Sequence, residues 1–254
     1  MNSTIRNLIA AATASAGIVG ASHAQQPAVK NVVLVHGAFA DGSGWRGVYD
    51  ELTSRGYRVT IVQNPLTSLA DDVAATRRAL ARQDGATILV GHSWGGTVIT
   101  EAGGNDKVKA LVYVAAFAPS AGEASLDGVK GYPSSPGLAS PIATPDGFLT
   151  LSPETVAKDF AQDVTAEEAN LIATTQGAVR GANFEEKVTV AAWTAKPSWY
   201  IVADEDRMIQ PDAQRALAKK INATTTSLPT SHVPMVSRPK DVAEVIAAAA
   251  KSLD

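Results

Sequence analysis

Residues 89–97 read LVGHSWGGT, and the interpretation of the chain turns on this stretch. Ser93 lies between Gly91 and Gly95, directly after the apolar run 86–90 and before a run with helical character. A strand that turns sharply into a helix holds a serine in a strained backbone geometry and raises its hydroxyl above the sheet edge. The context therefore favours a nucleophilic serine over the alternative, a small residue in an ordinary turn.

A nucleophilic serine needs a base and an acid that orients the base. This type of turn predicts the chain order serine, acid, histidine. His232 is the one histidine after Ser93 in the sequence, and it follows the last predicted strand. A side chain in that position reaches over the sheet edge, so His232 is the predicted base. The alternative is a histidine on a surface loop.

Three carboxylates, Asp204, Glu205 and Asp206, follow the strand that precedes this histidine. They cannot all lie in the core, because burial of an unpaired charge is costly. We expect one of them to turn toward His232, while the others face solvent or pair with Arg207. The spacing alone does not choose among the three.

Acyl transfer also needs two backbone N–H groups aimed at the developing oxyanion. The pattern places one at Trp94, directly after the serine, and the other in the glycine-rich loop after the first strand. In that loop Ala38 is the best-placed donor and Phe39 is the next. His36 precedes the serine in chain order, so we interpret it as a structural histidine that hydrogen-bonds the loop. His92 receives no role.

Short apolar runs alternate with helical patterns along the rest of the chain. Most of the runs are continuously apolar, which is typical of strands buried on both faces of a parallel sheet. The alternation predicts an open, doubly wound α/β sheet. The predicted strands are 32–35, 57–63, 86–91, 110–116, 197–203 and 224–229. The predicted helices are 45–55, 69–83, 94–104, 211–220 and 238–252, with Pro211 and Pro239 suited to first helical turns.

Residues 119–196 interrupt this alternation. The insertion is too long for a simple loop between two sheet strands, so it predicts a cap or lid. We expect a helical stretch from Ser152 to Thr175 and no clear strand within the insertion. The alternative is a disordered surface segment, against which apolar residues such as Phe148 and Phe160 argue.

Composition and charge exclude several classes of protein. The 254 residues suffice for one α/β domain, and a net charge of −3 without a basic run argues against a nucleic-acid partner. The absence of cysteine excludes a disulfide framework and a thiolate metal site. None of the four histidines pairs with another at ligand spacing, so no metal is expected. No segment after the N-terminus approaches the ~20 apolar residues of a membrane span.

The N-terminus has the pattern of a targeting segment. It contains Arg6, then an alanine-rich apolar run, and then small residues at 22–24. This order predicts a signal peptide over residues 1–24, with cleavage after Ala24. The mature protein, 25–254, is then periplasmic or secreted. The alternative is a cytoplasmic extension that stays on the chain.

Five stretches together carry a resemblance to a known family: VLVHGAFADGSGW, VGHSWGG, LVYVAAFAP, DEDRMIQPDAQ and SHVPMVSRPKDVAEVI. They resemble the α/β-hydrolase superfamily. More closely, they resemble its small branch of plant methylesterases and hydroxynitrile lyases, with bacterial esterase relatives. The resemblance covers about residues 31–253. It implies the α/β-hydrolase fold with a cap insertion, here with the reduced, six-stranded sheet because few residues precede the first strand.

The resemblance also implies residue roles. Relatives carry Gly-x-x-Asp at the end of the strand before the acid. Here Ala203 takes the place of the glycine and Asp206 falls on the aspartate, with Asp204 as runner-up. Hydroxynitrile lyases of this branch have threonine where this chain has Gly37, and lysine where it has Val233. Both departures favour ester hydrolysis over cyanohydrin cleavage.

The sequence therefore predicts a cofactor-free serine carboxylester hydrolase that acts on a small, partly apolar ester. The expected pocket walls are the cap and the surroundings of Phe39, Trp94, Phe117 and Val233. One alternative keeps the triad and changes the reaction to that of a lyase, lactonase, C–C hydrolase or perhydrolase. Another is a binding protein without turnover, against which an intact serine, aspartate and histidine argue.

Overall fold

The computed structural model describes residues 29–253 of the chain. The predicted signal peptide, residues 1–24, lies outside the described residues and stays a prediction. No helix within 29–253 has the length and apolar character needed to cross a membrane.

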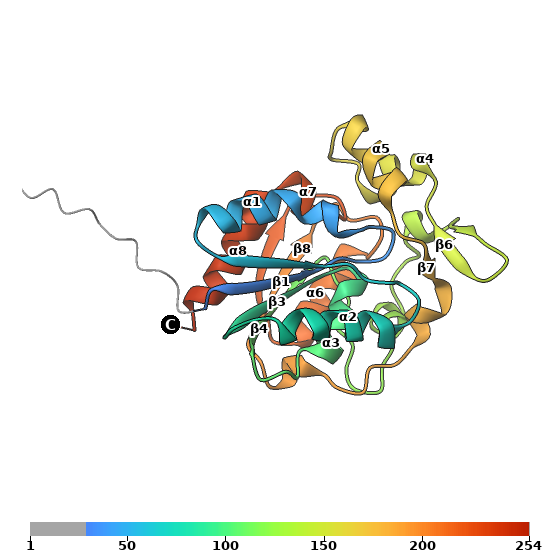
Figure 1. Cartoon of the computed structure of the whole chain (residues 1–254). Helices are drawn as coiled ribbons and strands as arrows, with labels where there is room; N and C mark the ends of the chain where they lie inside the picture. The colour runs from blue at the N-terminus through green and yellow to red at the C-terminus, as the bar shows by residue number, and fades with distance from the viewer. Residues whose placement is uncertain (1–28, 254) are drawn as a thin grey trace, which may run out of the picture.

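A six-stranded sheet forms the centre of the molecule (Figure 1). Its order is β2-β1-β3-β4-β8-β9, and every neighbouring pair is parallel. The predicted open, doubly wound sheet is thereby confirmed. The strands are β1 Asn31–Val35, β2 Arg58–Val62, β3 Thr87–His92, β4 Val108–Val114, β8 Ser198–Ala203 and β9 Thr224–Leu228. The central strands β1 and β3 are wholly buried, as continuously apolar strands between two helical layers must be.

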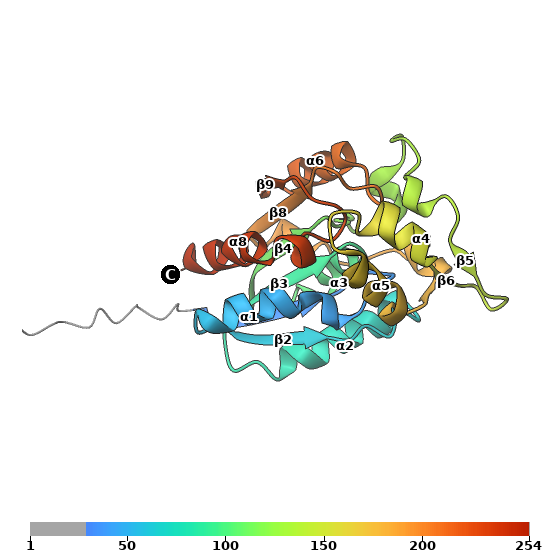
Figure 2. The same ribbon diagram turned by 90° about the horizontal axis from the view of Figure 1, so that it is seen from above.

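Helices cover both faces of this sheet. Figures 1 and 2 show α1 and α8 on one face and α2 and α3 on the other. Proline occupies the first turn of α6 and of α8, as predicted, because its fixed φ suits a helix start. The helices of this part of the chain are α1 Arg46–Ser54, α2 Leu69–Ala81, α3 Trp94–Ala102, α6 Pro211–Lys220, α7 Pro234–Ser237 and α8 Pro239–Lys251, with a 3₁₀ turn η1 at Gly42–Trp45.

The boundaries of β4 differ from the prediction, and the cause at its end is local. The predicted strand 110–116 is instead β4, Val108–Val114. Ala115 has a φ of 44°, which no strand residue adopts, so the chain turns there. The turn lets the amide of Phe117 donate to the carbonyl oxygen of Ser93, which ties the end of β4 to the start of α3.

The insertion 119–196 is folded, and it contains more than the predicted helix. The expected helical stretch from Ser152 to Thr175 is present but interrupted. It ends at Phe160 and resumes at Ala166, where the Thr165 side chain caps the new helix by accepting from the amide of Glu168. A small antiparallel sheet, β5-β6-β7, was also not predicted. The elements are η2 Ser125–Val129, η3 Pro136–Leu138, β5 Ile142–Ala143, β6 Phe148–Thr150, α4 Pro153–Thr155, the π-helical turn η4 Val156–Phe160, α5 Ala166–Thr175, β7 Val179–Arg180, η5 Gly181–Glu185 and η6 Ala192–Thr194.

The sheet topology gathers four predicted site residues at one edge. Ala38 follows β1, Ser93 follows β3, Asp206 follows β8 and His232 follows β9. Because all six strands are parallel, their carboxyl ends meet at the same edge, where ligands bind in open α/β sheets. Residues 119–196 emerge from the same edge, after β4 and before β8 (Figure 1).

Candidate active site

Ser93 lies in the turn between β3 and α3 with φ 53° and ψ −121°. A positive φ is uncommon for a residue with a side chain, and it marks the strained geometry expected of a nucleophile elbow. Two glycines permit this close approach. A Cβ on Gly91 would lie 2.5 Å from the carbonyl oxygen of Gly95, and one on Gly95 would lie 2.6 Å from that of Val35.

Ser93, His232 and Asp206 lie in one hydrogen-bonded row. Ser93 Oγ is 2.9 Å from His232 Nε2, and His232 Nδ1 is 2.6 Å from Asp206 Oδ2. All three residues are buried. Since Nδ1 faces a carboxylate, it carries the ring proton, which leaves Nε2 free to accept the serine hydroxyl proton. This arrangement can activate the hydroxyl as a nucleophile.

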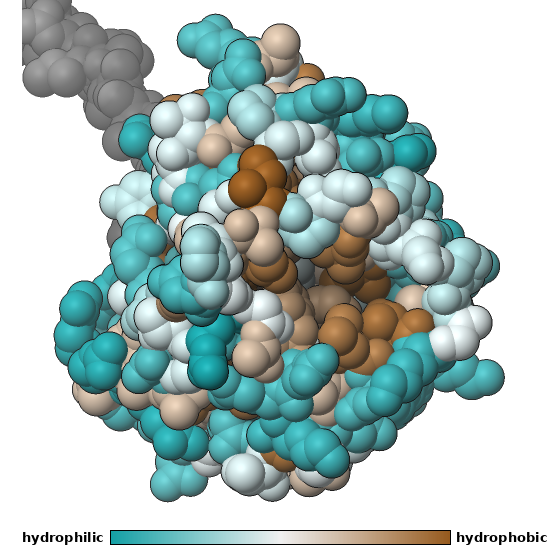
Figure 3. Space-filling view, turned by 90° about the vertical axis from the view of Figure 1, so that its right-hand side faces the viewer, coloured by the Kyte–Doolittle hydropathy of each residue, from teal (hydrophilic) through white to brown (hydrophobic). Residues whose placement is uncertain are grey.

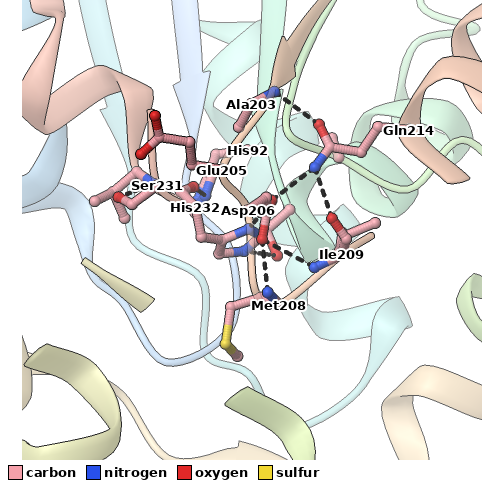
Figure 4. Close-up of polar contacts among 12 residues, drawn as sticks. His92, Ala203, Glu205, Asp206, Met208, Ile209, Gln214, Ser231 and His232 are labelled. Carbon is pink, nitrogen blue, oxygen red and sulfur yellow. Dashed lines mark hydrogen bonds and ion pairs between the residues drawn. The ribbon is translucent and has the colours of Figure 1, made fainter. Parts of the chain in front are cut away.

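Asp206 is held by three donors besides the histidine (Figure 4). The amides of Met208 and Ile209 donate to Oδ1 at 2.6 and 3.0 Å. Gln214 of α6 donates through Nε2 to Oδ2 at 2.7 Å, while its Oε1 accepts from the amide of Ala203. Four hydrogen bonds to one carboxylate fix its orientation. The role of Gln214 was not anticipated from the sequence.

The other carboxylates of this loop point elsewhere. Of the two expected arrangements, Glu205 is exposed to solvent, while Asp204 pairs with Arg215 at 2.5 Å on the surface and not with Arg207. Arg207 instead contacts Asp159 of the insertion at 2.5 Å. Among the three candidates, Asp206 alone contacts His232, so the geometry selects it.

The insertion is tied to both loops that carry the acid and the base. Gln162 Nε2 donates to the carbonyl oxygen of Glu205 at 2.7 Å. Asp163 Oδ2 accepts from the amide of Ser231 at 3.0 Å. The ring of Phe160, from the π-helical turn, packs edge-on against the His232 ring at a centroid distance of 5.1 Å. The insertion therefore helps to hold these loops in register with Ser93.

Two further buried histidines support the site. His36 accepts from the amide of Asn64 through Nε2 and donates through Nδ1 to the carbonyl oxygen of Gly37. This confirms its interpretation as a structural histidine, and burial lowers its pKa. His92, which received no role, donates through Nε2 to the carbonyl oxygen of His232 at 2.8 Å. Burial lowers the pKa of His92 well below its usual value, so it stays neutral and braces the loop of the base.

The two residues predicted to supply amides for the oxyanion lie near Ser93: Trp94 follows it in the chain and Ala38 lines the same cavity. Trp94 is the first residue of α3, where the N–H groups have no partner within the helix. Ala38 lines the same cavity as Ser93, and its amide donates to no acceptor within residues 29–253. Both N–H groups are therefore available to a ligand at this point.

A buried carboxylate fixes the side chain of Trp94. Asp72 of α2 is fully buried, and its Oδ2 accepts from Trp94 Nε1 at 2.7 Å. Its Oδ1 accepts from the amide of Leu66 at 2.7 Å. Burial raises the pKa of Asp72 to about 6, against the lowering effect of these two hydrogen bonds. Asp72 therefore anchors the residue that follows Ser93, at a cost in stability.

This raised pKa predicts a pH-dependent stability. Between the ordinary value of 3.8 and about 6, folded Asp72 keeps a proton that the unfolded chain releases. Stability should therefore fall by about 2.4 kcal/mol as the pH rises from 4 to 7, out of about 3 kcal/mol for the whole transition, since one pKa unit corresponds to about 1.36 kcal/mol. The Asp72→Asn variant should lose this component, as measured by denaturant unfolding at several pH values.

The neighbouring Asp71→Asn variant is the control for this experiment. Asp71 lies on the same helix but is exposed, and hydrogen bonds from Thr67 and Ser68 lower its pKa. Removal of the Asp71 carboxylate should leave the fall in stability with rising pH in place. If the Asp72→Asn variant shows the same decline as the wild type, the assignment to Asp72 is wrong.

A cavity of about 330 Å³ opens above Ser93 and His232. Its other walls are apolar: Ala38, Phe39, Phe117, Leu126, Leu138, Pro141, Leu149, Phe184, Met208 and Ile209, with Gly181. Figure 3 shows hydrophobic residues gathered in a hollow on this face of the molecule. The insertion supplies the residues from Leu126 to Phe184, as expected of the cap, although the sequence did not indicate which of its residues would do so.

Two expected wall residues do not line this cavity. Val233, the N-cap residue of α7, lines a smaller hollow with Phe160 and Met235 instead. The indole of Trp94 is turned to Asp72, and its ring packs against Phe184. The expected walls Phe39 and Phe117 do line the cavity.

No cluster of three or more histidine, aspartate or glutamate side chains within residues 29–253 could hold a metal ion. The site offers an activated hydroxyl, a base, and two unpaired N–H groups beneath an apolar cavity. These are the elements that acyl transfer requires.

Comparisons with known proteins agree with this geometry. Residues 32–245 match the family described as the alpha/beta hydrolase family. A pyrethroid hydrolase of Sphingobium wenxiniae is 30% identical over 247 residues, which cover 86% of this chain and 87% of that protein. The crystal structure of a pyrethroid hydrolase from Sphingobium faniae JZ-2 superposes with a TM-score of 0.74 at 25% identity, covering 88% of this chain and 98% of that one.

A second solved structure has the same fold. The crystal structure of polyneuridine aldehyde esterase has a TM-score of 0.75 at 19% identity, and covers 87% of this chain and 98% of that one. At this identity the likeness shows the fold alone. Together with the family match, these comparisons establish the class of the protein. The chain belongs to the alpha/beta hydrolase family and is an enzyme of the hydrolase class.

Proposed function

We propose that the protein hydrolyses carboxylic esters through a Ser93–His232–Asp206 triad and an acyl-enzyme intermediate. The observation that carries the proposal is the unbroken row of contacts from Ser93 Oγ to His232 Nε2 and from His232 Nδ1 to Asp206 Oδ2. This row lies at the base of an apolar cavity. A hydroxyl with a base in reach, and an acid that orients the base, is the arrangement that serine acyl transfer uses.

The first half of the reaction forms the acyl-enzyme. Ser93 Oγ attacks the ester carbonyl carbon while His232 Nε2 takes the hydroxyl proton. The carbonyl oxygen becomes an oxyanion, which accepts hydrogen bonds from the amides of Ala38 and Trp94. When the intermediate collapses, the C–O bond to the alcohol breaks and His232 returns the proton to the departing oxygen. Asp206 stays charged and stabilises the imidazolium throughout.

The second half releases the acid. A water molecule gives a proton to His232 Nε2 and attacks the acyl carbon, which forms a second oxyanion at the same amides. The bond to Ser93 Oγ then breaks, and His232 protonates the serine oxygen. Atoms balance without a metal or an organic cofactor, since ester and water give acid and alcohol.

The relatives support an ester as the substrate class. The relative at 30% identity is named a pyrethroid hydrolase, and one solved structure with the same fold is named an esterase. A pyrethroid is for this reason one ester to assay. The cavity walls favour substrates with an apolar group next to the carboxyl.

Cyanohydrin cleavage on the same triad is the less favoured reaction. A Cβ on Gly37 would lie 2.6 Å from the Cβ of Ser93. The threonine found there in the hydroxynitrile lyases that this chain resembles would not fit this backbone. The position of their lysine holds Val233, which does not line the cavity above Ser93.

Covalent labelling tests the proposal directly. A nitrophenyl alkylphosphonate should react once per chain and release one equivalent of nitrophenol, because its phosphorus mimics the carbonyl carbon under attack. Peptide mass spectrometry should place the adduct on Ser93. The unlabelled enzyme should hydrolyse esters of a test panel, and the labelled enzyme should hydrolyse none of them. Labelling at another residue, or esterase activity that survives full labelling, contradicts the assignment.

A further inference from the structure

A second cavity, of about 350 Å³, lies next to the one above Ser93. It does not reach Ser93 or His232. Its far end is lined by the loop 129–135, with the polar side chains of Tyr132 and Ser134, and by Gln210 at the start of α6. Gln210 Nε2 lies 3.5 Å from the carbonyl oxygen of Ser134, across this end.

The two cavities share one wall. Phe117, Leu126, Leu138, Met208 and Ile209 line both of them. The shared residues are all apolar, and Leu138 is 38% exposed. A substrate group that extends from the ester carboxyl past these side chains stays in contact with an apolar surface as it enters the second cavity.

The size of the two cavities bears on what they hold. Ligand cavities commonly measure about 300 to 1,000 Å³, and they bury most of the ligand. The first cavity alone, at about 330 Å³, suits one modest group beside the reacting carboxyl. The second roughly doubles the space, and a small ester would leave it unused.

We infer that the second cavity is a substrate subsite, so that the preferred substrates are esters with a bulky group on each side of the carboxyl. This inference rests on the proposed function. One group packs in the first cavity against Phe39 and Phe184, where the walls are apolar throughout. The other passes Leu138 and Met208 and ends among the polar side chains of the second cavity.

Filling the second cavity tests the inference. Ala139 lines it, is exposed and does not contact the first cavity, so a tryptophan there adds bulk without disturbing the core. The probes are benzyl 4-phenylbutanoate, which has two bulky groups, and two esters with one each, methyl 4-phenylbutanoate and benzyl acetate. Acid release is followed by pH-stat. The Ala139→Trp variant should lower kcat/KM at least about tenfold for the two-group ester and less than about twofold for the others.

Two further variants keep the result interpretable. Ser140→Trp is the matched control, since Ser140 is the exposed neighbour and lines neither cavity; it should behave as the wild type. Ser135→Trp fills the second cavity from another position and should repeat the selective loss. An equal loss on all three esters, an unchanged two-group ester, or the same effect from Ser140→Trp overturns the subsite. A wild-type enzyme that cleaves none of the three overturns the proposed ester hydrolysis itself.

Discussion

The Ser93→Ala variant is expected to lose esterase turnover by about 10⁴- to 10⁶-fold. Ser93 Oγ is the atom 2.9 Å from His232 Nε2, and no other hydroxyl within residues 29–253 contacts that nitrogen. Without it no acyl-enzyme forms, and the remaining rate comes from water held near the base and the amides. The measurement is the steady-state kcat for a nitrophenyl ester, with the release burst as a second readout.

The matched control is Ser198→Ala. Ser198 is as buried as Ser93, each being 6% exposed, but it lies on β8, where its hydroxyl contacts the carbonyl oxygen of Lys196. This variant should keep the wild-type kcat within about twofold. Both variants should unfold at similar temperatures, so that the contrast reports chemistry. Full activity in the Ser93→Ala variant would falsify the nucleophile assignment.

The sheet and its edge could be predicted because local patterns determine them. Continuous apolar runs such as β1 and β3 allow burial on both faces, and that requirement leaves few arrangements other than a parallel sheet between helices. The parallel topology then brings the residues that follow β3, β8 and β9 to the same edge of the sheet. The predicted end of β4 was misplaced for an equally local cause, the positive φ of Ala115. An alanine in the sequence does not indicate a positive φ.

The insertion was harder to predict because its structure depends on contacts with the rest of the chain. Leu126, Leu138 and Leu149 lie on short turns and strands without a hydrophobic period, yet they line the cavity above Ser93. Period-based reasoning finds helices and strands that bury one regular face. A wall built from single apolar residues on separate turns leaves no such period.

Polar residues that act through another residue were also missed, for a related reason. Gln214 is an ordinary helix residue in sequence, and His92 is an unconstrained position in its motif. Their hydrogen bonds to Asp206 and to the carbonyl oxygen of His232 join segments that are close only in the folded chain. Sequence spacing between Asp204 and Asp206 could not decide the acid either. The resemblance favoured Asp206, which is the one of the two that contacts His232.

Asp204 and Asp206 allow a matched pair of substitutions two positions apart, with opposite expected effects on kcat. Asp206→Asn should lower kcat by about 10⁴-fold, and Asp204→Asn should leave it within about twofold. Asp204 is tied only to arginine on the surface. Asp206 is buried and contacts the ring of His232.

The size of the Asp206 effect follows from its four hydrogen bonds. Oδ1 accepts from two backbone amides, so an asparagine must keep its oxygen there and place its NH₂ group where Oδ2 was. That NH₂ would face His232 Nδ1 and Gln214 Nε2, both of which donate in the wild type. His232 can relieve the clash only by moving its proton to Nε2, and a protonated Nε2 cannot accept from Ser93.

The Asp206→Asn variant should therefore lose the function of the base while its pocket stays intact. For the Asp206→Asn variant, kcat should fall with little change in the affinity for a non-hydrolysable apolar ligand, because the cavity wall does not include Asp206. A nitrophenyl ester assay and a ligand titration measure the two quantities. Comparable losses in the two variants, or a larger loss from Asp204→Asn, would mean that Asp206 does not set the tautomer of the base, and the proposed triad would need another acid.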